Sequence, residues 1–168
     1  MLTEPTREQV LEFCSREPVE RVFLEDVARR GLGRFAAEER PDGTLASLCH
    51  IGTNLVPSGE ACGAYRKAAA SSKARMIIGE AVAVGDLWAA ARDALPPARE
   101  DRPGQPVYAI SEPPPPGDSG LRAARHADLD VLVPASAAAH ALELGIDPLA
   151  RGDDSFRWRT AAQIDEGR

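Results

Sequence analysis

Hydrophobic positions at the start of the chain recur at helical spacing. The segment from Thr6 to Gln9 is a capping-box pattern, in which the Thr hydroxyl and the Gln amide satisfy two backbone N–H groups at a helix start. The helix that it opens is expected to stop before Pro18, which suits the first turn of a second helix because it has no N–H to satisfy. Gly31 and Gly33 are expected to end the second helix in left-handed backbone. Its apolar stripe, at positions i, i+3, i+4 and i+8, consists of Val19, Val22, Phe23 and Val27.

From residue 33 onward the pattern changes to short apolar segments divided by turn residues, which predicts strands. Residues 33–51 are expected to form a hairpin with its turn at Pro41–Gly43, and residues 53–57 a third strand. A loop and a helix follow over residues 59–72. The remaining elements of this part are a buried strand at 74–80, a helix at 84–95 and a final strand at 105–110. The pattern therefore predicts an α+β domain.

A proline-rich segment divides the chain. Residues 111–120, SEPPPPGDSG, contain four consecutive prolines, which favour extended polyproline and a stiff spacer. We therefore predict an N-terminal domain over residues 1–111, a linker over 112–120 and a second part over 121–168.

The second part is too short to close a sheet of its own. It is expected to hold a short strand, a helix that Pro134 kinks or restarts, and a last helix capped by Asp153 or Asp154. One strand and two helices cannot bury a sizeable core. Either these elements pack on the first domain, or the chain is a piece of a longer protein. Because exposed strand edges favour pairing, we expect the isolated chain to self-associate or to be marginally stable.

Composition and charge narrow the class of partner. The chain has 168 residues, and its formal net charge of −6 with scattered arginines argues against a nucleic-acid-binding surface. A helix needs about 18 apolar residues in a row to cross a bilayer, and no apolar run of the chain approaches that length, so no membrane span is expected. The N-terminus also lacks the basic and apolar segments of a signal peptide.

The cysteines are odd in number and widely spaced, which is typical of reduced thiols in a cytoplasmic protein: Cys14, Cys49 and Cys62.

Several segments carry a resemblance to a known family. They are LASLCHIGTNLVP at 45–57, RPGQP at 102–106, LRAARHADLDVLVPA at 121–135, GIDPLARGD at 145–153 and FRWRTAAQIDEGR at 156–168. In these segments the chain resembles bacterial, actinobacterial-type GNAT family N-acetyltransferases that carry an N-terminal domain of unknown function. The similarity covers essentially the whole chain. It implies a degenerate GNAT-like mixed sheet flanked by helices, followed by an incomplete second GNAT-like unit.

The resemblance also implies an activity, the transfer of an acetyl group from acetyl-CoA to an unknown amine acceptor. The family's acetyl-CoA signature, a strand followed by an Arg/Gln-x-x-Gly-x-Gly/Ala loop, would lie after residue 168, as would the general base and acid. No catalytic residue and no metal ligand is therefore assigned. The chain is expected to be the front portion of an acetyltransferase, without turnover by itself. The alternative is a non-catalytic module with a regulatory, dimerising or substrate-recognising role.

The segment PSGEACGA at 57–64 stands where such enzymes bind the pyrophosphate of acetyl-CoA. There, backbone N–H groups at a helix N-terminus hold the negative charge, and glycines let the backbone approach closely. This segment has only two glycines, lacks the usual basic residues, and brings the Glu60 carboxylate beside the diphosphate. We therefore expect a pseudo-site that only turns a strand into a helix. If the loop does bind acetyl-CoA, its candidate contacts are Val56, Ser58, Gly59, Gly63 and Ala64.

Other chemistry-bearing residues give no catalytic or metal site. Cys49 and His50 are neighbours on a strand and so point to opposite faces, which excludes a direct nucleophile–base pair. Together with Cys62 they lack the paired spacing of a zinc site. His126 suits a capping or surface role, and His140 a packed or exposed position on a helix.

Aromatic residues are interpreted mainly as core. Tyr65 and Tyr108 could serve as a terminal acid, but a core position is expected for both and for Trp88. Phe156 and Trp158 lie roughly 200° apart around a helix, so they can anchor two different surfaces. Two basic side chains on the same helix are interpreted as solvated charges, with a substrate contact as the alternative: Arg157 and Arg159.

Overall fold

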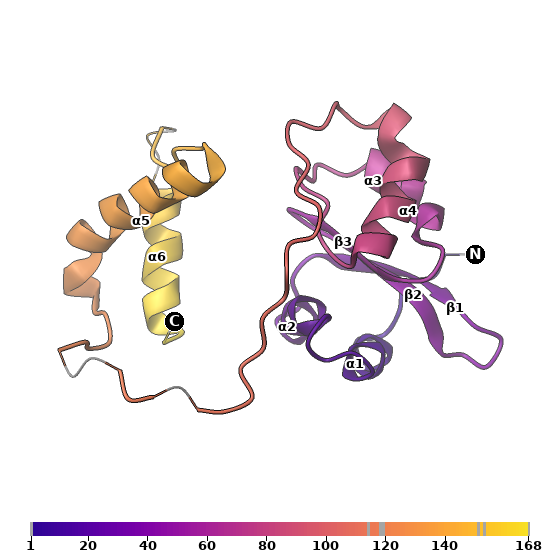
Figure 1. The fold of residues 1–168 in the computed structure, drawn as a ribbon, viewed down its shortest axis with the longest axis horizontal. Helices are drawn as coiled ribbons and strands as arrows, with labels where there is room; N and C mark the ends of the chain where they lie inside the picture. Colours follow the sequence, from indigo (N-terminus) through magenta and orange to yellow (C-terminus); the bar gives the residue numbers. More distant parts are fainter. Residues whose placement is uncertain (1, 114, 118–119, 151, 153, 168) are drawn as a thin grey trace. The chain divides into compact units, whose positions relative to one another are not determined.

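The computed structural model describes residues 2–113, 115–117, 120–150, 152 and 154–167 (Figure 1). The chain divides into two compact units, Met1–Ala109 and Ile110–Arg168. The described residues form six α-helices and one open, three-stranded antiparallel sheet, so the α+β class predicted from the sequence is confirmed. In this part of the chain no helix is both long enough and apolar enough to cross a membrane.

The first unit begins with two short helices, α1 (Arg7–Ser15) and α2 (Val22–Arg29). The predicted capping box of α1 is confirmed. The Thr6 hydroxyl accepts from the Gln9 backbone N–H at 3.2 Å, and the Gln9 side chain accepts from the Thr6 N–H at 2.9 Å. Two glycines in left-handed backbone follow α2, as predicted: Gly31 and Gly33, with φ of +65° and +68°.

The face that α2 buries differs from the predicted stripe. Three of the four stripe residues are 41–60% exposed: Val19, Val22 and Phe23. The buried residues of the helix are Leu24, Val27 and Ala28. Residues 18–21 form turns, so the helix starts later than Pro18. The side chain of Arg21 lies on the sheet side, and Leu24 and Ala28, at i+3 and i+7, share that side.

The sheet consists of β1 (Arg34–Glu39), β2 (Leu45–Ile51) and β3 (Leu55–Gly59) in the order β1-β2-β3. The predicted hairpin and third strand are therefore confirmed. At the hairpin turn, the Arg40 N–H donates to the Thr44 carbonyl at 2.8 Å.

The chain after β3 forms η1 (Cys62–Tyr65), α3 (Arg66–Ala70), α4 (Ala81–Ala91) and η2 (Arg92–Ala94). Both helices predicted for this region, over 59–72 and 84–95, are thus confirmed, although α4 begins three residues earlier than expected.

The strand predicted at 74–80 is reduced to a single parallel bridge between Ile77 and Leu55. Leu55 N–H donates to the Met76 carbonyl at 2.9 Å, and Ile78 N–H donates to the Leu55 carbonyl at 3.0 Å. Continuing the ladder would require a donor at Pro57, which has no N–H. Met76 and Ile78 are about half exposed, at 49% and 45%, so the prediction of a buried strand was wrong.

The strand predicted at 105–110 is not formed, and three of its side chains are 64–86% exposed: Val107, Tyr108 and Ile110. Both sheet edges already carry a partner. Thr3 pairs with Ala37 on β1, and the bridge to Leu55 lies on β3. Pro106 removes a further donor within the segment. The core position expected for Tyr108 was therefore also wrong.

Helices cover both faces of the sheet, with α1 and α2 on one side and α3 and α4 on the other (Figure 1). Each face has its own buried cluster. The first core cluster, against α1 and α2, comprises Val10, Phe13, Cys14, Leu24, Ala28, Ala37, Leu45, Leu48 and Val56. The second core cluster, against α4, comprises Cys49, Ile51, Leu55, Cys62, Tyr65, Ala69, Ala83, Leu87 and Ala91.

The second unit contains η3 (His126–Asp128), α5 (Leu129–Leu144) and α6 (Ser155–Asp165). Its small buried cluster joins the two helices through Leu129, Val133, Ala137 and Phe156. α5 continues through Pro134, so the helix does not restart there. Asp154 takes the N-cap position of α6 without a side-chain cap bond, and the alternative cap Asp153 lies outside the described residues.

The short strand predicted at the start of the second part is not formed over residues 121–125. A strand needs a neighbour, and the described residues of this unit contain no other strand with which to pair. Arg122 instead donates to both carboxylate oxygens of Asp128, at 2.8 Å each.

Candidate functional site

The structure distributes the five candidate acetyl-CoA contacts over two elements. Val56 and Ser58 lie on β3, where their exposed fractions are only 5% and 2%. Gly59 is the last residue of β3, and Gly63 and Ala64 lie in η1. Val56 belongs to the first core cluster, so its side chain serves packing.

Gly59 is required by the packing of β3 on β2. Its φ is +92°, a backbone conformation that residues with a side chain rarely adopt. A Cβ there would lie 2.6 Å from the Ala46 carbonyl oxygen and 2.9 Å from the Ser47 Cα. The close approach that this glycine permits is therefore to the chain's own backbone.

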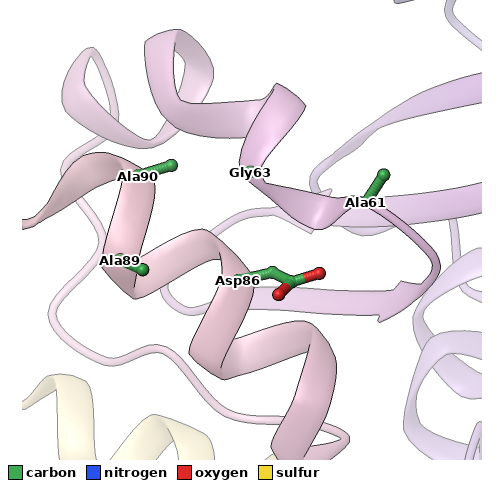
Figure 2. A pocket seen from close by; sticks show the side chains of 5 residues that line it. All are labelled: Ala61, Gly63, Asp86, Ala89 and Ala90. Atoms are coloured by element: carbon green, nitrogen blue, oxygen red, sulfur yellow. The ribbon is translucent and has the colours of Figure 1, made fainter.

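A shallow hollow lies between η1 and α4, lined by Ala61, Gly63, Asp86, Ala89 and Ala90 (Figure 2). Asp86 is the one charged lining residue, and a carboxylate repels a diphosphate. Glu60, on the same loop, is bound to Arg40 at 3.0 Å. The helical segments after the loop are short, four residues in η1 and five in α3. They offer little helix dipole to an anion.

A polar cluster lies at the C-terminal end of β3 and centres on the carboxylate of Glu80. We call it the Arg21 cradle: the Arg21 guanidinium, the Ser58 hydroxyl and the Gly59 N–H surround that carboxylate. Ser58 Oγ–H donates to Glu80 Oε1. Arg21 Nε lies 3.4 Å from the same oxygen and donates to Ser58 Oγ at 2.9 Å. The Gly59 N–H donates to Glu80 Oε2 at 3.4 Å.

Local structure holds both charged groups of the cradle in place. Arg21 is only 9% exposed, its guanidinium lies 3.9 Å above the Phe13 ring, and its Nη1 donates to the Phe13 carbonyl at 2.8 Å. Gly79 precedes Glu80 with φ +153° and passes close to the Pro57 carbonyl, where a Cβ would lie at 2.7 Å. A buried cation requires a partner because its desolvation is costly. Glu80 supplies the compensating charge.

The second core cluster contains two thiols and a phenol, all inert at neutral pH. Burial raises the pKa of Cys49 and of Cys62 to about 12, so both remain protonated thiols. Burial likewise raises the pKa of Tyr65, whose hydroxyl is hydrogen-bonded to Ser47 Oγ at 2.8 Å. Tyr65 is thus a core residue, as predicted, with its hydroxyl facing inward.

His50 lies on the opposite face of β2 from Cys49, as predicted. Its Nε2 is 3.0 Å from the Leu32 carbonyl, while its Nδ1 is buried without a hydrogen-bond partner among the described residues. The Phe35 and Phe23 rings lie 5.2 and 6.1 Å from its ring. Burial lowers the pKa of His50, so the ring is neutral at pH 7.

In the second unit, two of the polar residues singled out from the sequence pair with carboxylates, and the other two contact an aromatic ring. His126 Nε2 lies 2.7 Å from Asp165 Oδ1, which joins η3 to the end of α6. Arg157 is bound to Asp130 at 2.8 Å. The two other predicted surface or helix residues contact the Phe156 ring: Arg159 with its guanidinium at 4.7 Å and His140 with its ring at 6.1 Å.

Aromatic exposure in α6 confirms that its two aromatics face different ways, because Phe156 is 6% and Trp158 75% exposed. Trp88 on α4 is half-buried rather than a full core residue. Among the described residues, no cluster of three or more His, Cys, Asp or Glu side chains is placed to hold a metal ion.

The sequence alone does not point to Arg21 or Glu80, which are 59 positions apart. One signal is present: Arg21 lies at helical spacing from the buried Leu24 and Ala28, so a charged residue occupies a core-facing position.

A family model described as a domain of unknown function (DUF4081) matches residues 33–132. The match covers more than half of the chain and includes β1 to α4 and the Arg21 cradle residues Ser58, Gly59 and Glu80. Comparison with curated proteins and with solved structures gave no match.

Proposed function

The chain belongs to the DUF4081 family, and from this premise we propose that it is the front portion of a GNAT-type N-acetyltransferase whose first unit does not itself bind acetyl-CoA. In this proposal the complete protein transfers an acetyl group to an amine acceptor. The acetyl-CoA motif, the base and the acid lie downstream of residue 168. The first unit is a non-catalytic, GNAT-like module.

Two features support the GNAT-like part of the proposal. The order of elements in the first unit is two helices, three antiparallel strands, a loop and helices. This is the order that the resemblance implies for a unit that places its cofactor loop after a strand. The segments that carry the resemblance, residues 45–57 and most of 121–135, lie within the family match.

The observation that carries the non-binding part is the position of Glu80. The Gly59 N–H, which a cofactor loop would offer to a diphosphate, donates to the carboxylate of Glu80. A diphosphate approaching this end of β3 would meet Glu80, and Asp86 in the adjacent hollow. Two carboxylates in place of the expected basic residues make the site unfavourable for an anion as large and as charged as acetyl-CoA.

Calorimetric titration of the full chain with acetyl-CoA tests this proposal, with desulfo-CoA as the control ligand. We expect no detectable heat for the wild type and no difference for Gly63→Glu, which places a further carboxylate beside Ala90 at the hollow. Micromolar binding that Gly63→Glu abolishes would contradict the non-binding part. The acetyltransferase part has a separate test, the reading of the gene downstream of residue 168 for a strand followed by the Arg/Gln-x-x-Gly-x-Gly/Ala loop.

A second role for the first unit, self-association, is favoured by one observation. The turn before α2 and the first turn of α2 present apolar side chains that are 41–60% exposed, namely Val19, Val22 and Phe23. Exposed apolar patches commonly mark contact surfaces. Light scattering tests this role. A dimer that Phe23→Glu converts to monomer would support it, whereas a wild-type monomer at all concentrations would exclude it.

A further inference from the structure

The Arg21 cradle has the chemistry of an oxyanion-binding site that a side chain of the same protein fills. A buried guanidinium, a hydroxyl and a backbone N–H converge on the carboxylate of Glu80. We propose that this occupant is exchangeable: a phosphate or carboxylate group from outside the chain displaces Glu80 and binds to Arg21, Ser58 and the Gly59 N–H. The inference concerns binding alone and is independent of whether the complete protein transfers acetyl groups.

Arg21 is not fully used by its present partners. Nη1 donates to the Phe13 carbonyl and Nε contacts Ser58 Oγ and Glu80 Oε1, whereas no hydrogen bond joins Nη2 to another described residue. The guanidinium edge formed by Nε and Nη2 matches an oxyanion that offers two oxygens. Glu80 reaches only Nε, at the long distance of 3.4 Å. A free phosphate or carboxylate can bond to Nη2 and share the single Nε–H with Ser58 Oγ, and the tethered carboxylate does not make the bond to Nη2.

Glu80 is held by the cradle alone and is open to solvent on its outer side. Its side chain is 30% exposed while that of Arg21 is 10% exposed, so solvent reaches the carboxylate from outside. It stands at the N-cap position of α4 but makes no side-chain cap bond to that helix. All of its side-chain hydrogen bonds and ion pairs with described residues lie within the cradle, so rotating it outward breaks no other polar interaction.

The size of the cradle limits the ligand class. The three donors surround the volume of one carboxylate, and Arg21 and Ser58 are 9% and 2% exposed. The group that fits is a single phosphate or carboxylate of a free ion or a small molecule. The diphosphate of acetyl-CoA is larger than the single carboxylate that the cradle holds, so displacement of Glu80 does not open a site for it. The cradle and the hollow beside η1, which Asp86 lines, are therefore different sites.

The test is titration of the full chain with inorganic phosphate and, in a parallel experiment, with acetate. Binding is monitored through the NMR chemical shifts of the backbone amides, and the starting buffer contains neither ion. We expect weak, saturable shifts at Ser58, Gly59 and Glu80 in the wild type. Glu80→Ala should bind at least tenfold more tightly because the competing carboxylate is gone. Adding Arg21→Lys to Glu80→Ala should weaken binding at least tenfold, since lysine keeps the charge but loses the two-point fork. Asp93→Ala, which changes a fully exposed side chain, serves as the control with wild-type affinity.

The two arms identify the ligand chemistry: tighter phosphate binding indicates a phosphate-bearing ligand, and tighter acetate binding a carboxylate. The proposal is overturned if the wild type shows no shift at the cradle with either ion. It is equally overturned if folded Glu80→Ala binds neither ion more tightly than the wild type. Should Glu80→Ala fail to fold, Glu80→Gln replaces it, with tighter binding than the wild type as the expected result and equal affinity as the contrary one.

Discussion

Removing the Glu80 carboxylate should destabilise the first unit through the charge that it leaves behind. In Glu80→Ala, Ser58 loses its acceptor and Arg21 keeps only neutral partners while 9% exposed. Breaking a fully buried ion pair by removing one partner costs roughly 3–5 kcal/mol. Glu80 is 30% exposed, and solvent reaches its side of the pair, so a loss below that range applies. We expect a loss of about 2–3 kcal/mol in the free energy of unfolding.

Urea denaturation followed by circular dichroism, in a buffer without phosphate or carboxylate, measures this loss. Asp93→Ala is the matched acidic control, because its side chain is fully exposed and a change within about 0.5 kcal/mol is expected. Arg21→Met should destabilise the Glu80→Ala variant less than it destabilises the wild type. In Glu80→Ala the Arg21 cation has already lost its compensating charge, so removing that cation costs less unfolding free energy. A Glu80→Ala loss below about 0.5 kcal/mol, or strictly additive effects, would refute the view that Glu80 neutralises a buried charge.

Three further predictions concern backbone packing and titration. Gly59→Ala should destabilise the first unit by about 2 kcal/mol or more in chemical denaturation, because its Cβ would meet the Ala46 carbonyl at 2.6 Å with φ +92°. Stability should fall as the pH rises above 9: the pKa values of Cys49 and Cys62 are raised from 9.0 to about 12, so the unfolded thiols ionise first, and Cys49→Ala should flatten this slope. Because the pKa of His50 is lowered in the folded chain, its contribution to folding stability is present above pH 6.5 and is lost as the pH falls through its folded pKa. His50→Gln should therefore make stability depend less steeply on pH on the acid side.

Local signals in the sequence predicted the elements that depend on neighbouring residues. The capping box at Thr6, the turn at Pro41–Gly43 and the glycines after α2 each act within a few positions, and all three are confirmed. The opposite faces of Cys49 and His50 follow from strand alternation and needed only the correct strand assignment.

The errors concern elements whose state depends on distant parts of the chain. The apolar residues at 105–110 suit a strand, but whether a strand forms depends on a free sheet edge, and Thr3 and Ile77 already pair at the two edges. The stripe on α2 was misassigned because Arg21 occupies the buried side, and a charged residue is acceptable there only through its contact with Ser58 and Glu80. The cradle was beyond sequence reasoning for the same reason: its charged members meet only in the folded chain.

The central proposal is that the end of β3 does not bind acetyl-CoA, because the carboxylate of Glu80 takes the place of a bound anion there. Calorimetric titration of the wild-type chain with acetyl-CoA tests it most directly. We predict no detectable heat at ligand concentrations far above those that saturate a working cofactor site. Saturable micromolar binding, lost in Gly63→Glu, would contradict the claim and make the first unit a cofactor-binding domain.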